Sequence, residues 1–145
     1  MSCMKRICVA LSSLLLVGCL TPENVLMTDV DMHNWDRFES VTYNNSDTLS
    51  LRKLNIAVRY NNDYKPTTLS MMVYVTTPDT LHFEEEITLN IHHPHSGNAL
   101  ATTESLPYRD SILLSRSGDY SFSFAPLDSV CGIEAIGIDI RDISE

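Results

Sequence analysis

Cysteine is scarce in this 145-residue chain, and the four that occur are unevenly placed. Cys3, Cys8 and Cys19 lie within or directly after an N-terminal apolar stretch, so export with cleavage before Cys19 and modification of that residue would leave Cys131 as the one free thiol. An intramolecular disulfide is then excluded, and an apolar core must hold the domain together. Because its neighbours are apolar, we expect Cys131 to be a small buried residue rather than a nucleophile.

Basic residues are also few. The chain has 10 lysines and arginines against 19 aspartates and glutamates, for a formal charge of −9. Loss of residues 1–18 would remove Lys5 and Arg6 and no acid, leaving 8 basic against 19 acidic residues, or −11. Nucleic acids and anionic membrane surfaces bind through lysine and arginine, so neither is an expected partner.

Glycine-rich motifs are missing among the five glycines. The sequence contains no phosphate-cradling glycine loop and no Gly-x-Ser-x-Gly elbow around any of its serines. We therefore expect neither an enzyme nor a bound cofactor.

The longest apolar run is short. It extends from Ile7 to Val17, follows Lys5 and Arg6, and is interrupted only by two serines. Eleven helical residues reach about 16 Å, well short of the ~30 Å hydrocarbon core of a bilayer. Residues 1–18 are thus predicted to be a secretion signal rather than a permanent transmembrane helix.

The signal ends in Leu16-Val17-Gly18-Cys19, which resembles the lipobox of bacterial lipoproteins. This resemblance implies cleavage between Gly18 and Cys19 and a thioether-linked diacylglycerol on Cys19. Each buried methylene contributes about 0.8 kcal/mol and two or more acyl chains give stable anchoring, so the lipid would hold the protein on a membrane. Residues 19–34 are then predicted to be the lipidated cysteine and its tether, and residues 35–145 the folded domain.

Alternation of period two dominates the remainder. Leu69, Met71, Val73 and Val75 share one face of a run, and the next run, 81–91, alternates in the same way after the turn at 77–79, which predicts a hairpin. Further strands are expected at 36–43, 54–60, 111–114, 120–124 and 133–140. Short strands at this spacing predict an all-β fold, an antiparallel β-sandwich of the jelly-roll or immunoglobulin-like kind.

Three of the five histidines, His92, His93 and His95, lie within four positions. Imidazole is a common zinc and copper ligand, yet successive strand residues point to opposite faces and Pro94 ends the strand. At most two ligands come from the loop, and a third would have to be Glu104 or Asp110. We therefore expect no metal, and keep a metal-dependent enzyme as a hypothesis of lower rank.

Three carboxylates follow one another at Glu84, Glu85 and Glu86. Alternation directs Glu84 and Glu86 to one face and Glu85 inward, where it needs a partner such as Arg59 or Arg109. A catalytic pair would require carboxylates from different segments. The expected role is a charged solvent face that discourages edge pairing.

Aromatic side chains leave two alternatives open. A sugar-stacking platform needs exposed rings, whereas the same rings can instead close the core at the ends of the sheets. The candidates are Trp35, Tyr43, Tyr60, Tyr64 and Tyr74.

Two longer stretches resemble a known family. The segment "NIAVRYNNDYKPTTLSMMVYVTTPD" (55–79) and the closing "SGDYSFSFAPLDSVCGIEAIGIDI" (117–140) are similar to the gliding-motility-associated lipoprotein GldH family of Bacteroidota. The matching positions are Trp35, Arg59, Asn61, Tyr64, Leu69, Pro78, Gly118, Tyr120, Gly132, Ile133, Ile136 and Gly137. The chain departs from the family pattern at "HHPHSGNALATTES" and at Ala125-Pro126-Leu127.

The resemblance implies a non-enzymatic lipoprotein that assists the gliding machinery or its associated protein-secretion apparatus by contacting other envelope proteins. An envelope carbohydrate-binding module is the alternative. The candidate binding surface is Trp35, Arg59, Tyr64 and Tyr120. Because Leu20 follows the anchor and no acidic cluster comes after it, we expect attachment to the outer membrane, facing the periplasm.

Overall fold

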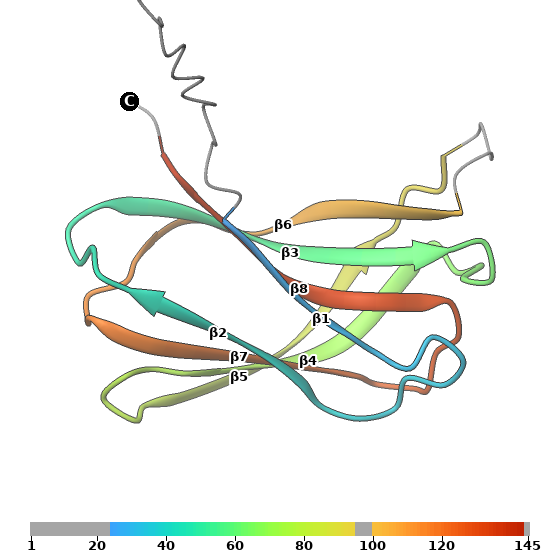
Figure 1. Cartoon of the computed structure of the whole chain (residues 1–145), viewed down its shortest axis with the longest axis horizontal. Coiled ribbons are helices and arrows are strands. Elements are labelled where there is room, and N and C mark those ends of the chain that lie inside the picture. The colour runs from blue at the N-terminus through green and yellow to red at the C-terminus, as the bar shows by residue number, and fades with distance from the viewer. Residues whose placement is uncertain (1–23, 95–99, 144–145) are drawn as a thin grey trace, which may run out of the picture.

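The computed structural model describes residues 24–94 and 100–143, and these form two stacked antiparallel sheets. The first sheet has the order β1-β8-β3-β6 and the second β2-β7-β4-β5, which confirms the predicted all-β sandwich (Figure 1). The strands are β1 (Val25–Asp29), β2 (Glu39–Asn45), β3 (Leu51–Asn61), β4 (Thr68–Thr76), β5 (His82–Asn90), β6 (Ala101–Leu113), β7 (Gly118–Pro126) and β8 (Ile133–Asp142). None of the described residues form a helix with the length and apolar character of a membrane span.

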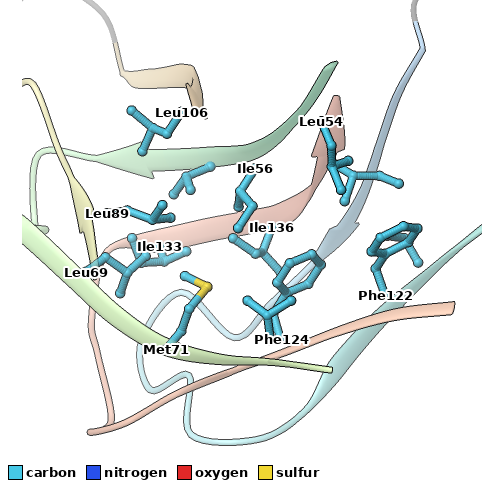
Figure 2. Packing of buried hydrophobic residues seen from close by; sticks show 14 of the residues in the cluster. Leu54, Ile56, Leu69, Met71, Leu89, Leu106, Phe122, Phe124, Ile133 and Ile136 are labelled. Carbon is cyan, nitrogen blue, oxygen red and sulfur yellow. The ribbon is translucent and has the colours of Figure 1, made fainter. Parts of the chain in front are cut away.

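The core lies between the sheets and follows the alternation of the sequence. Ile56 of β3 and Ile136 of β8 are fully buried and face Met71 and Phe124 from the second sheet (Figure 2). Val58 of β3 is also fully buried. Adjacent β3 and β8 are antiparallel, with Ile56 opposite Ile138 and Val58 opposite Ile136. Such pairs of β-branched residues pack well on a pleated surface, which is why this sheet is so rich in isoleucine.

The hairpin of β4 and β5 has the expected turn. Leu69 lies opposite Leu89 and Val75 opposite Phe83, and the register has no shift along the nine pairs. Thr77 N donates to Leu81 O at 3.0 Å and closes the turn. The strands expected near 54–60, 120–124 and 133–140 are also present, each somewhat longer than predicted.

Two strands were not anticipated at these bounds. Residues 20–34 were expected to be a tether, but Val25–Asp29 form β1 and pair with β8, with Met27 opposite Gly137. Strand β6 begins at Ala101, ten residues before the expected start at 111. Both strands lie at the edges of the first sheet. An edge strand pairs with one neighbouring strand and is partly exposed to solvent, so its sequence need not show a clear apolar alternation.

Cys131 is exposed, so the expectation that it is buried was wrong. It lies between Val130, whose backbone pairs with that of Trp35, and the turn at Gly132. The strand alternation does not extend through this turn, so apolar neighbours did not indicate the direction of the thiol.

Gly132 provides the tight turn that leads into β8. It has φ +94°, and a Cβ at this position would lie 2.2 Å from Tyr64 N. Its amide donates to Met32 O at 2.7 Å, and its carbonyl accepts from Asn61 N at 2.8 Å. The residue therefore joins three segments at a point where a side chain has no room.

We predict that Gly132→Ala lowers the free energy of unfolding by more than about 2 kcal/mol, because backbone strain and a clash with backbone atoms add. The matched control is Gly118→Ala, which also has positive φ (+117°) but would meet only the Pro78 side chain, at 3.1 Å. Urea denaturation of both variants measures the difference. Equal losses would show that the contact with Tyr64 is unimportant.

Candidate binding site at the open edge of the sandwich

Three residues of the expected binding surface are part of the core. Trp35, Tyr64 and Tyr120 are 1%, 2% and 4% exposed. Their polar atoms are used internally: Trp35 Nε1 donates to Arg37 O (2.7 Å), Tyr64 Oη to Thr68 O (2.6 Å), and Tyr120 Oη accepts from Arg116 N (3.1 Å). These rings close the core, so Trp35 and Tyr64 cannot serve as an accessible platform, whereas Tyr120 also lines the cleft described below.

The fourth residue, Arg59, lies on the outer face of the first sheet. It alternates with buried Val58 and Tyr60, and its Nε donates to Glu134 Oε2 at 3.0 Å. Asn61 Nδ2 donates to the other oxygen of that carboxylate at 3.2 Å. Arg59 thus forms a surface ion pair on the side of the sheet opposite the buried rings, and the four candidates do not make one surface.

The histidines separate as the alternation required. His93 Nε2 donates to Pro66 O at 2.7 Å and its ring stacks on Tyr64, with the two centroids 6.4 Å apart. His92 instead lies beside Glu104, with Nδ1 3.7 Å from Oε2. His95 is outside the described residues, and among those described no group of three histidine, cysteine or acidic residues is placed to hold a metal.

Tyr60 adds a second contact at this end of the molecule. Its hydroxyl lies 3.0 Å from Glu104 Oε1 and 2.8 Å from His92 O. Burial, together with the adjacent Glu104 carboxylate, raises the pKa of Tyr60 to about 12. Through these contacts Tyr60 of β3 and Glu104 of β6 tie the segment just after β5 to the first sheet.

Glu85 is turned toward the opposite sheet and has the kind of partner that the sequence required. Its Oε1 accepts from Arg109 and from the hydroxyl of Tyr108. Arg109 was one of the two arginines expected, whereas Arg59 is engaged elsewhere. We call Glu85, Tyr108 and Arg109 the cross-sheet clasp.

Tyr108 was not foreseen from the sequence. The register of β3 against β6 skips this residue, since Leu54 lies opposite Arg109 and Asn55 opposite Pro107. Such a bulge re-aims a side chain, and here Tyr108 meets Glu85 across the gap between sheets. Burial and the bond to Glu85 raise the pKa of Tyr108. A Pro-Tyr pair within a polar run is the only local sign of the bulge.

Beside the clasp lies an apolar cleft of about 520 Å³. It opens between the β4–β5 turn and the end of β6, and the side chains at its mouth are Leu81, Phe83 and Leu113, which are 54%, 58% and 49% exposed. Leu54, Leu114 and Phe122 of the core line it more deeply. We call this feature the open-edge cleft.

A second ion pair borders the cleft. Arg116 Nε donates to Asp79 Oδ2 at 3.3 Å. The Thr77 hydroxyl, which donates to the same carboxylate, and Arg116 lower the pKa of Asp79. The cleft therefore has an apolar interior between two acid–arginine pairs, an arrangement suited to noncovalent binding of an apolar group.

The family model of the GldH lipoproteins matches residues 26–140. This chain belongs to the GldH lipoprotein family. The match extends from β1 into β8 and so includes nearly the whole sandwich, and it confirms the family resemblance seen in the two sequence segments. A search of the curated proteins finds no match.

Membership identifies the chain as a gliding-motility-associated lipoprotein, with the membrane-associated place in the cell envelope that a lipoprotein has. Gly18 and Cys19, which carry the expected cleavage and lipidation, lie outside the described residues.

We predict that Glu85→Gln lowers the free energy of unfolding by about 1 kcal/mol, because it weakens two hydrogen bonds across a half-exposed gap. Glu84→Gln is the matched control, since that carboxylate points to the outer face and should change stability by less than about 0.5 kcal/mol. Denaturant titration at neutral pH measures both. A loss no larger than the control's would mean that the clasp does not hold the sheets together.

Proposed function

We propose that this GldH-family lipoprotein is a non-enzymatic accessory component of the gliding-motility and associated protein-secretion machinery, and that it acts by contacting other envelope proteins. The observation that supports this most is the gathering of Leu81, Phe83 and Leu113 at the mouth of one cleft. Large apolar side chains exposed together typically mark an interaction site, whereas single ones are common on any surface.

A binding role without catalysis fits the groups around the cleft. Its two carboxylates, Asp79 and Glu85, are each paired with an arginine. Ser115 is the only serine of the lining, and no histidine is there to act as its base.

The expected lipid anchor would place the cleft near a membrane surface. Lipid on Cys19 would hold the domain at the periplasmic face of the outer membrane, as the residues after the cysteine suggest. Confinement to a surface raises the effective concentration near membrane-bound partners, so a small cleft is sufficient for a useful interaction.

We predict that Leu81→Ser/Phe83→Ser reduces cross-linked capture of envelope proteins from intact cells, because it removes the apolar mouth of the cleft. Phe38→Ser is the matched control. The exposed fraction of Phe38, 55%, is similar to the 58% of Phe83, but Phe38 packs against Tyr74 on the outer face of the second sheet. The same proteins should be recovered with the control and with the unaltered chain. A Cys19→Ala variant tests the anchor. If the unaltered chain captures no more envelope protein than Cys19→Ala does, the proposal is contradicted.

A second candidate, carbohydrate binding, is favoured by one surface feature. The rings of Phe38 and Tyr74 lie 4.8 Å apart, edge to face, on the outer face of the second sheet. Ser40 and Ser123 bond beside them (2.6 Å), and Glu84 is opposite Tyr74, so hydroxyls and a carboxylate surround the rings.

Calorimetry against envelope polysaccharide fragments tests this alternative. If it holds, Tyr74→Ala abolishes binding and the buried Tyr64→Phe, which keeps its ring in the core, leaves it unchanged. Absence of heat with every fragment would eliminate the alternative.

A further inference from the structure

Strand β5 differs from the other three sheet edges. β1 has five residues and β2 seven, and these two neighbouring strands contact one another on the closed side of the sandwich. β6 is long but contains Pro107 and a shift of register. β5 has nine residues, contains no proline and keeps a continuous register with β4. It is thus the one long, regular edge among the described strands, the kind on which another strand can pair.

The backbone groups of β5 that face away from β4 can be assigned. Thr77 N donates to Leu81 O at one end of the hairpin, and Ile91 N donates to Thr67 O (2.8 Å) at the other. In an antiparallel ladder the residues bonded to the neighbour alternate, so the odd-numbered residues of β5 bond to β4. The N–H and C=O groups that point outward belong to His82, Glu84, Glu86, Thr88 and Asn90.

The side chains of β5 make its inner face apolar near the cleft and its outer face acidic. On the inner face, Phe83 lies at the mouth of the open-edge cleft, next to Leu81. On the outer face, Glu84 and Glu86 are both exposed. Glu85, between them, is held by Arg109 in the clasp and is not available to a ligand.

We propose that β5 accepts an extended segment of a partner protein as a fifth strand of the second sheet. The proposal rests on the function proposed above, because it names the mode by which a protein partner binds. Alternate residues of the segment are lysine or arginine, which face Glu84 and Glu86. The residues between them are apolar and enter the cleft beside Phe83.

Charge selects this occupant over a second copy of the chain. Two copies of β5 paired antiparallel about their centre would place Glu86 opposite Glu86, and like charges directly opposite are destabilising. A basic strand instead gains complementary charge from a protein whose formal charge is −9.

The test uses the full chain in detergent micelles and a ten-residue synthetic peptide that alternates lysine and valine. Residue-resolved amide hydrogen exchange is measured with and without the peptide. We expect exchange at Glu84, Glu86 and Thr88 to slow at least tenfold at saturation, whereas the odd-numbered amides, which already bond to β4, change little. Protection confined to β1, β2 or β6, or none, would overturn the proposal.

Two variants separate charge from backbone pairing. Glu84→Lys/Glu86→Lys should weaken peptide binding at least tenfold and favour a peptide that alternates glutamate and valine. Asp63→Lys/Asp128→Lys is the matched control, with the same change in net charge at exposed positions outside β5. Thr88→Pro removes one outward N–H without changing the charge and should also abolish binding. Equal affinity of the charge-reversed and control proteins would contradict the proposed partner chemistry.

Capture from cells distinguishes this inference from the proposed function. If Glu84→Lys/Glu86→Lys still recovers the envelope proteins that Leu81→Ser/Phe83→Ser loses, the partner uses the cleft alone, and the added strand is excluded. If no variant and no unaltered chain recovers a protein, but the edge amides are protected by the peptide, strand addition stands and the envelope role fails.

Discussion

The structure depends on the burial of two alternating apolar faces against each other. Ile56 and Ile136 of one sheet and Met71 and Phe124 of the other are entirely removed from water. Because no disulfide joins the described residues, this burial must offset the chain entropy lost on folding. The cross-sheet clasp lies beside a core that this packing holds together.

The chain path then makes the two sides of the sandwich unequal. β1 and β2 are consecutive, belong to different sheets and contact each other, which closes one side. β5 and β6 are also consecutive and also at sheet edges. Across the gap between them Glu85 pairs with Arg109, and His92, just after β5, lies beside Glu104. Polar contacts span a gap that apolar side chains leave open, and the cleft is the result.

The open-edge cleft combines apolar side chains with carboxylates that are paired with arginines, and such a surface is suited to binding. The cleft offers apolar contacts to a partner. The β5 edge offers backbone hydrogen-bonding groups, which would align a partner strand, and the negative charges of Glu84 and Glu86. Acidic residues on a strand edge commonly prevent association with other strands. In this chain Glu84 and Glu86 would also favour a basic partner strand over an acidic one.

We could infer the all-β class, the hairpin, the inward direction of Glu85 and the family from the sequence alone, because alternation and short motifs are local properties. The sequence could not place β1 or the start of β6, whose pairing depends on β8 and β3. Nor could it show that Trp35, Tyr64 and Tyr120 are buried, since an aromatic ring suits a core and a binding platform equally well. The tertiary structure decided these points, because only the meeting of distant strands sets which edge stays open and which rings lose contact with water.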